Sequence, residues 1–166
     1  MIELMIAIAV LAILAGLALP SFRAAVQNNR ISSQANELLT AFHLARSEAL
    51  KRNSPVVVCA SSDGDTCTGG WTDGWIVAEV DAVPGSSSQT IENVIRTWSA
   101  PVGGTTFTVD PNATLFRFLP RGEIDSGLMT AQTTINILTP GCTGDRARDI
   151  RINRIGRVTV EDAACP

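Results

Sequence analysis

The hydrophobic pattern opens with an unbroken apolar run at residues 4–19, which carries no charged side chain. The run is slightly shorter than the roughly 18–20 residues of a typical membrane span. Glu3 precedes it and Pro20 follows it. A secretory signal peptide would show a basic segment before the run and a small-residue cleavage site after it. Because neither is visible, we expect residues 1–26 to be retained as a hydrophobic helix that lies in a membrane or in a bundle of helices.

A helical pattern continues over residues 21–52 and ends before Pro55, which cannot continue a helix. Apolar residues recur there every three or four positions, which predicts an amphipathic helix over residues 27–53. The stripe consists of Ile31, Ala35, Leu38, Phe42, Ala45 and Ala49. Together with the apolar run, this gives a helix of about 50 residues, roughly 75 Å long. Pro20 is the expected place for a kink or local unwinding.

After Pro55 the pattern changes to short apolar runs separated by clusters of Gly, Pro, Ser and Asp, which is typical of strands and turns. No strand–helix alternation is visible. We therefore predict an α+β fold, in which an antiparallel sheet or small sandwich over residues 55–166 lies against the amphipathic half of the helix. The globular domain comprises residues 27–166. The predicted strands are residues 56–60, 75–80, 91–98, 105–109, 115–119, 133–138, 149–153 and 157–161.

The four cysteines indicate an oxidising compartment. They lack CxxC spacing and histidine partners, so two disulfides are favoured over a zinc site. Of the three pairings that four cysteines allow, we favour Cys59–Cys67, which closes a short loop, together with Cys142–Cys165. The second bond fits a three-stranded meander, because the ends of its first and third strands point the same way.

Catalytic and ligand-binding motifs are missing from the sequence. With one histidine, His43, and no nucleophile elbow, P-loop or HExxH motif, we expect no enzyme, catalytic residue, cofactor or small-molecule substrate. Asp63 and Asp65 resemble the start of a calcium loop. No further series of ligands follows them, so an acidic, solvated turn is the better interpretation and no metal site is predicted.

Several motifs resemble those of one protein family. Glu3, the apolar run and Pro20 resemble the N-terminal segment of type IV pilins. Four further segments resemble, in the right order, the minor pilins and pseudopilins of the GspH/FimT/FimU type. They are the helix end at residues 45–53, a W-x-x-G-W strand at 71–77, an F-x-P-x-G-like segment at 116–122 and a final hairpin at 150–160.

This resemblance implies a single-pass protein of the bacterial inner membrane with a periplasmic domain. Its partners would be other pilins, with which it assembles into a pilus or pseudopilus. In the family a basic leader is removed and the new N-terminal residue is often methylated; this sequence starts inside the familiar mature segment. Glu3 would pair with the N-terminal amine of a neighbouring subunit during assembly. The alternative is a carboxylate that reaches the lipid headgroups.

An arginine cluster is the most informative charge feature. Residues 145–157 contain five arginines and two aspartates, net +3, in a chain whose net charge is −3. Guanidinium groups suit phosphates, because their planar fork can donate two hydrogen bonds to one phosphate. The alternative is that they pair with acidic loops or a neighbouring subunit. The candidate residues for binding phosphate are Arg146, Arg148, Arg151, Arg154, Gly156 and Arg157.

Some FimT-type pilins bind DNA for natural transformation through a Gly-Arg-x-Arg motif. Here Gly156 and Arg157 match its start, and Thr159 replaces the second arginine. Two functions therefore stay open: a minor subunit that initiates a pilus or sits at its tip, and a DNA receptor on that pilus. A type II secretion pseudopilin shares all these features, and the cysteines and the final hairpin favour the pilus.

Overall fold

The computed structural model describes residues 2–110, 113–129 and 132–165 and confirms the α+β fold. Within these ranges a single helix is followed by eight strands, and each strand overlaps one of the predicted runs. The elements are α1 (Ile2–Arg52), β1 (Val56–Ala60), β2 (Gly74–Asp81), β3 (Thr90–Ser99), β4 (Thr106–Asp110), β5 (Leu115–Phe118), β6 (Thr133–Leu138), β7 (Ala147–Ile152) and β8 (Val158–Ala163).

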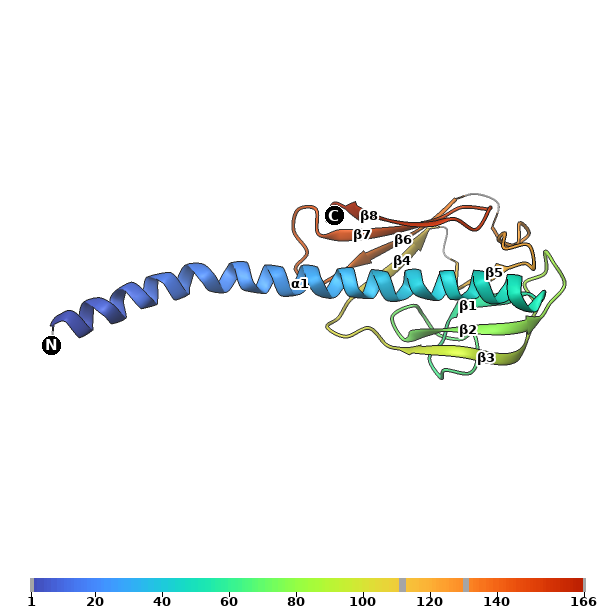
Figure 1. Ribbon diagram of the computed structural model, residues 1–166, viewed down its shortest axis with the longest axis horizontal. Coiled ribbons are helices and arrows are strands. Elements are labelled where there is room, and N and C mark those ends of the chain that lie inside the picture. Colours follow the sequence, from blue (N-terminus) through green and yellow to red (C-terminus); the bar gives the residue numbers. More distant parts are fainter. Residues whose placement is uncertain (1, 111–112, 130–131, 166) are drawn as a thin grey trace.

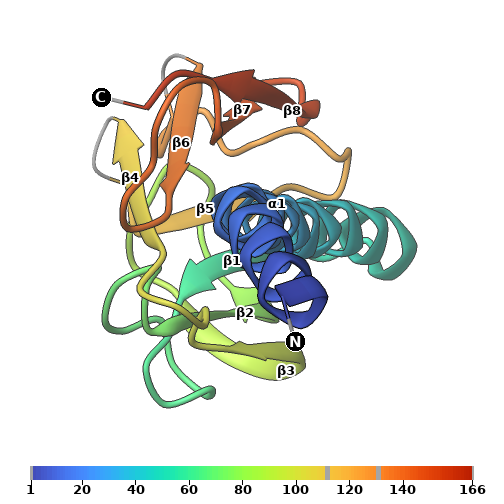
Figure 2. The same cartoon turned by 90° about the vertical axis from the view of Figure 1, so that its left-hand side faces the viewer.

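The strands form two four-stranded antiparallel sheets, ordered β3-β2-β1-β5 and β4-β6-β7-β8. The second half of α1 lies along the opening between them and contacts β1 and β2 on one side and β7 and β8 on the other (Figure 2). The first half of α1, residues 2–26, extends beyond the domain and is called the arm below (Figure 1). The shape is therefore that of a globular head on a helical stalk.

The predicted apolar stripe of α1 forms the centre of the core. All six of its residues are at most 1% exposed. Phe42 packs edge-on against Phe116 of β5, with ring centroids 5.3 Å apart, and also meets Phe118. From the other sheet, Ile150 of β7 and Ile135 of β6 complete the same cluster. Burial against both sheets, rather than helix propensity, holds this half of α1 in place.

The apolar arm of α1 is largely uncovered. Eight large apolar side chains between Ile2 and Ile13 are 50% to 73% exposed. The helix is continuous through Pro20, so no unwinding occurs there, and a bend at this residue stays a prediction. Within the part of the chain that the structure describes, no helix meets the length and hydropathy required of a membrane span.

The end of α1 is fixed by local contacts. Asn53 adopts a left-handed conformation (φ 52°), a common way for a helix to stop. Arg52 pairs with Glu48 one turn earlier and with Glu79 of β2 at 2.9 Å. The helix therefore ends against the sheet that follows it in the chain.

Both predicted disulfides are present. Cys59–Cys67 holds the β1–β2 connection over the outer face of the first sheet, where Val57, Ile76 and Ala78 form a second small core. Cys142–Cys165 joins the segment before β7 to the end of the chain after β8. The meander β6-β7-β8 that suggested this pairing is the observed one.

Candidate functional site

The arginine cluster lies on the β7–β8 hairpin, but its members point in different directions. Along β7, side chains alternate between the face that packs on α1 and the outer face. Arg148 shares the inner face with the buried Ile150 and Ile152, whereas Arg151 lies on the outer face. The five arginines therefore do not form one patch.

Arg148 is a structural residue of the domain. Its guanidinium pairs with Asp162 at 3.1 Å and donates to the side-chain oxygens of Asn28 and Ser32 on α1 at 3.0 and 3.2 Å. Its side chain is only 12% exposed. Because all these contacts are made within the chain, Arg148 is not available as a contact for phosphate.

Arg151 and Arg157 do share a site. Both line a shallow depression of about 270 Å³ on the outer face of the hairpin, beside Thr159. Arg151 lies directly opposite Thr159 in the β7–β8 register. An arginine from the neighbouring strand thus stands beside the position where the resembled DNA-binding motif has its second arginine. Arg151 is itself paired with Glu161 at 3.1 Å, which reduces the positive charge of the site.

The remaining candidates lie at the two ends of the hairpin. Arg154 lines a different groove, with Glu123 and Ile155. Arg146 precedes β7 at the opposite end. Gly156 is part of the turn, with φ +75°, and a Cβ there would clash with the Gly122 carbonyl oxygen. Gly156 is therefore required for the backbone to approach that closely, which gives it a structural role.

The charge of the hairpin is smaller than the arginine count suggests. β8 adds Glu161 and Asp162 to the two aspartates near β7, so residues 145–162 carry five positive and four negative charges, net +1. Both added acids pair with arginines of β7. DNA binding by this hairpin stays a prediction. Of the five arginines, only Arg151 and Arg157 line the same solvent-exposed depression.

The acidic turn after β1 is closed by its own hydrogen bonds. The Asp63 carboxylate accepts hydrogen bonds from the Thr66 side chain and from the backbone of Asp65 and Thr66, which holds its pKa well below the ordinary value. Ser61 also donates to it. Among the described residues, no cluster of three or more metal-ligating side chains occurs. The hydrogen bonds to Asp63 agree with the interpretation of this segment as an acidic turn.

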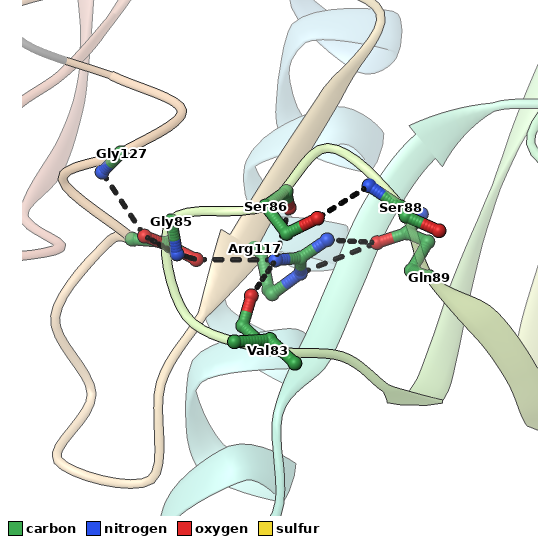
Figure 3. A network of polar contacts seen from close by, with 8 residues as sticks. Val83, Gly85, Ser86, Ser88, Gln89, Arg117 and Gly127 are labelled. Atoms are coloured by element: carbon green, nitrogen blue, oxygen red, sulfur yellow. Dashed lines mark hydrogen bonds and ion pairs between the residues drawn. The ribbon is translucent and has the colours of Figure 1, made fainter.

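A buried ion pair on the first sheet was not predicted from the sequence. Arg117 of β5 is fully buried and pairs with Asp125, which is 2% exposed, at 3.1 Å (Figure 3). The same guanidinium donates to the Ser86 carbonyl at 2.8 Å and to Gln89. Asp125 in turn accepts from the Gly85 backbone amide. The pair joins the β2–β3 loop to the connection between β5 and β6.

A signal for this pair was present in the sequence. Arg117 stands between Phe116 and Phe118, in a strand whose other residues are apolar. A charged residue in such a strand needs a buried partner, because burying an unpaired charge is costly. The identity of that partner depends on a loop conformation that no local pattern specifies.

Glu3 lies in the first turn of α1, where its side chain is exposed at the far end of the arm. It is thus remote from the globular domain (Figure 1). The side chain of Pro20 lies outside the described part of the arm. The assembly role of Glu3 and the bend at Pro20 accordingly stay predictions.

Solved structures share this fold. Two crystal structures of the type IV minor pilin FimU from Pseudomonas aeruginosa PAO1 superpose with TM-scores of 0.61 and 0.59, at 22% and 23% identity. They cover 80% and 79% of this chain, and 89% and 92% of the FimU chains. The minor pseudopilin EpsH from the type 2 secretion system of Vibrio cholerae has a TM-score of 0.54 at 14% identity, over 82% of this chain and 98% of EpsH.

Sequence comparison identifies the family. Functionally curated proteins give no significant match to the sequence. The model of the family described as type II transport protein GspH matches residues 34–156, well over half of the chain. Pilin-like proteins of this kind are structural and not enzymes. The chain therefore belongs to the GspH family of minor pilins and pseudopilins.

Proposed function

We propose that this protein is a minor type IV pilin that is held in the inner membrane by residues 1–26 and assembles with other pilins into a pilus. The observation that carries the proposal is the exposed apolar arm of α1 on an otherwise well-packed domain. Such an uncovered apolar surface marks a site that another molecule or a membrane covers. The arm provides a surface for lipid before assembly and for other helices after it.

Assembly would transfer this arm from lipid into the helical core of the filament. Both surroundings are apolar, so the exchange itself costs little free energy. Glu3 is the exception, because a carboxylate in an apolar environment needs a partner. We assign it the pairing with the N-terminal amine of a neighbouring subunit, which would fix the axial register of the arm.

A test of this function replaces Glu3 with Ala and, as a matched control, replaces the exposed Glu37 of the domain-bound half of α1 with Ala. We expect both variants to keep the folded domain, and the Glu3→Ala subunit alone to be depleted several-fold from sheared filaments. Its amount would be measured by immunoblotting against the amount in the membrane. Recovery of Glu3→Ala at the wild-type level would contradict the assembly role.

Within the filament we propose a place at the start or tip of a pilus, in keeping with the minor-pilin class. The alternative system is a type II secretion pseudopilus. Deletion of the gene separates the two, since a pilin would be needed for surface pili and a pseudopilin for export of folded enzymes.

A DNA-receptor function is the narrower alternative. The observation that favours it is the position of Arg151 and Arg157 around Thr159 on one open surface. Such a receptor would bind double-stranded DNA through its phosphates. It would still enter the filament by the same arm.

A further inference from the structure

Where α1 leaves the globular domain, side chains of the helix form hydrogen bonds with two different parts of the domain. On one side, Arg148 of β7 donates to Asn28 and Ser32. On the other side, the Gln34 amide nitrogen donates to the Val102 carbonyl at 3.0 Å, in the connection between β3 and β4. The β6–β7 and β3–β4 connections both lie at this end of the domain, beside α1 (Figure 1). We refer to this set of residues as the collar: Asn28, Ser32, Gln34, Val102 and Arg148.

The groups of the collar are themselves held in place. The Arg148 guanidinium is oriented by the ion pair with Asp162 and by a hydrogen bond to the Ala147 carbonyl at 2.9 Å. Hydrogen bonds from such a charged donor are stronger than neutral ones. On the opposite side, Arg30 lies so close to Gly103 that a Cβ there would clash with the guanidinium. The contacts thus define one position of the helix.

The disulfide Cys142–Cys165 stiffens the side of the collar that carries Arg148. It joins the segment before β7 to the segment after β8, and the Cys165 amide donates to the Gly144 carbonyl at 2.8 Å. Arg148 and Asp162 face each other in the β7–β8 register, close to this bond. The strand pair that presents Arg148 is therefore closed covalently at the end nearest the helical arm.

We infer that the collar sets the direction in which the arm of α1 leaves the domain, with Arg148 as its positioning residue. The inference rests on the proposed filament function. If the arm enters the filament core while the domain stays on the surface, its exit direction determines how the domain meets its neighbours. The stripe anchors the helix to the core from Ile31 onward, and the collar holds residues 28–34, where the packed part of the helix begins. Arg148 thus contributes to geometry rather than to ligand binding.

The inference is tested on the full chain in lipid nanodiscs by a distance between two spin labels. One label replaces the exposed Val26 on the arm, and the other replaces the exposed Asp81 at the end of β2. We expect one narrow distance distribution in the otherwise unchanged protein. Arg148→Ala should broaden or shift it, and Arg148→Lys, which keeps the charge but not the forked geometry, should give an intermediate width. Arg146→Ala, two residues away, is the matched control and should leave it unchanged.

Ser32→Ala with Asn28→Ala removes the same contacts from the helix side, and it serves if Arg148→Ala fails to fold. Broadening in this double variant supports the collar. A distribution as narrow as that of the unchanged protein, in a folded and fully disulfide-bonded Arg148→Ala or double variant, overturns it. The distance needs no filament, so this result is independent of whether Glu3→Ala alters assembly.

Discussion

At the scale of single residues, the pair of Arg117 and Asp125 places two opposite charges in the interior of the domain. Each group is almost completely removed from water. Such a pair contributes little net stability compared with apolar packing, but the loss of one partner leaves an uncompensated buried charge. Its importance is thus in fixing the loop around Gly85 and Ser86 against β5.

Arg117→Met tests this role. We expect it to lower the free energy of unfolding by about 3–5 kcal/mol, because Asp125 loses its buried counter-charge. Thermal and urea unfolding of the full chain in detergent, followed by near-ultraviolet circular dichroism, would measure the change. Arg121→Met removes an exposed arginine nearby and should have little effect. Equal stability of the two variants would show that the Asp125 carboxylate is satisfied by backbone amides alone.

The lowered pKa of Asp63 predicts that the stability of the fold depends on pH. Its pKa in the folded chain is lowered below the ordinary value of 3.8, chiefly by the hydrogen bonds from Thr66. A lowered folded pKa means that the carboxylate stabilises the fold above its unfolded pKa, and that this contribution is lost as pH falls toward the folded pKa. Asp63→Asn should therefore lower the melting temperature at pH 7, and the difference from wild type should shrink below about pH 4. Asp65→Asn is the control, and a gap that stays constant with pH would contradict the assignment.

At the scale of elements, the predicted strand boundaries were most accurate where apolar residues dominate. Strands β1 and β6 begin and end as predicted, because their residues alternate or cluster clearly between turn signals. Strand β7 begins at Ala147 instead of 149, since Arg148 on its inner face obscures the alternation. That arginine is inward because it has a partner on α1, and a partner 120 positions away is not a local signal.

The arrangement of the strands was less accessible than their existence. The sequence favoured an antiparallel sheet or small sandwich, which agrees with the two sheets observed, but it gave no order of the strands. In the structure, β5 leaves its sequence neighbours β4 and β6 and joins β1 in the other sheet. Such pairings depend on which apolar faces meet around α1, and they are not local. The two disulfides were the exception, because their spacing and the meander order restrict the pairing.

At the scale of the whole molecule, the apolar arm and the polar domain present two different kinds of surface. The arm supplies an uncovered apolar surface, and the domain supplies a rigid head with an uneven distribution of charge. The net charge of −3 disfavours general attraction to nucleic acid. Any affinity for DNA must then come from a local site, and the hairpin offers Arg151 and Arg157 on one surface.

This limit gives a quantitative expectation for binding of double-stranded DNA across a salt series. Two arginines that contact phosphate release few counterions, so the slope of log K against log salt should be no steeper than about −2. Binding should disappear in the variant with Arg151→Ala and Arg157→Ala, and it should be unchanged in Arg121→Ala, since Arg121 lies outside this site. A much steeper slope in the wild type, or binding that survives the double substitution, would place the DNA contact elsewhere on the domain. Absence of binding at low salt from a folded, disulfide-bonded chain would leave the hairpin with its structural role, in which Arg148 holds α1 and β8 supplies the acids that neutralise β7.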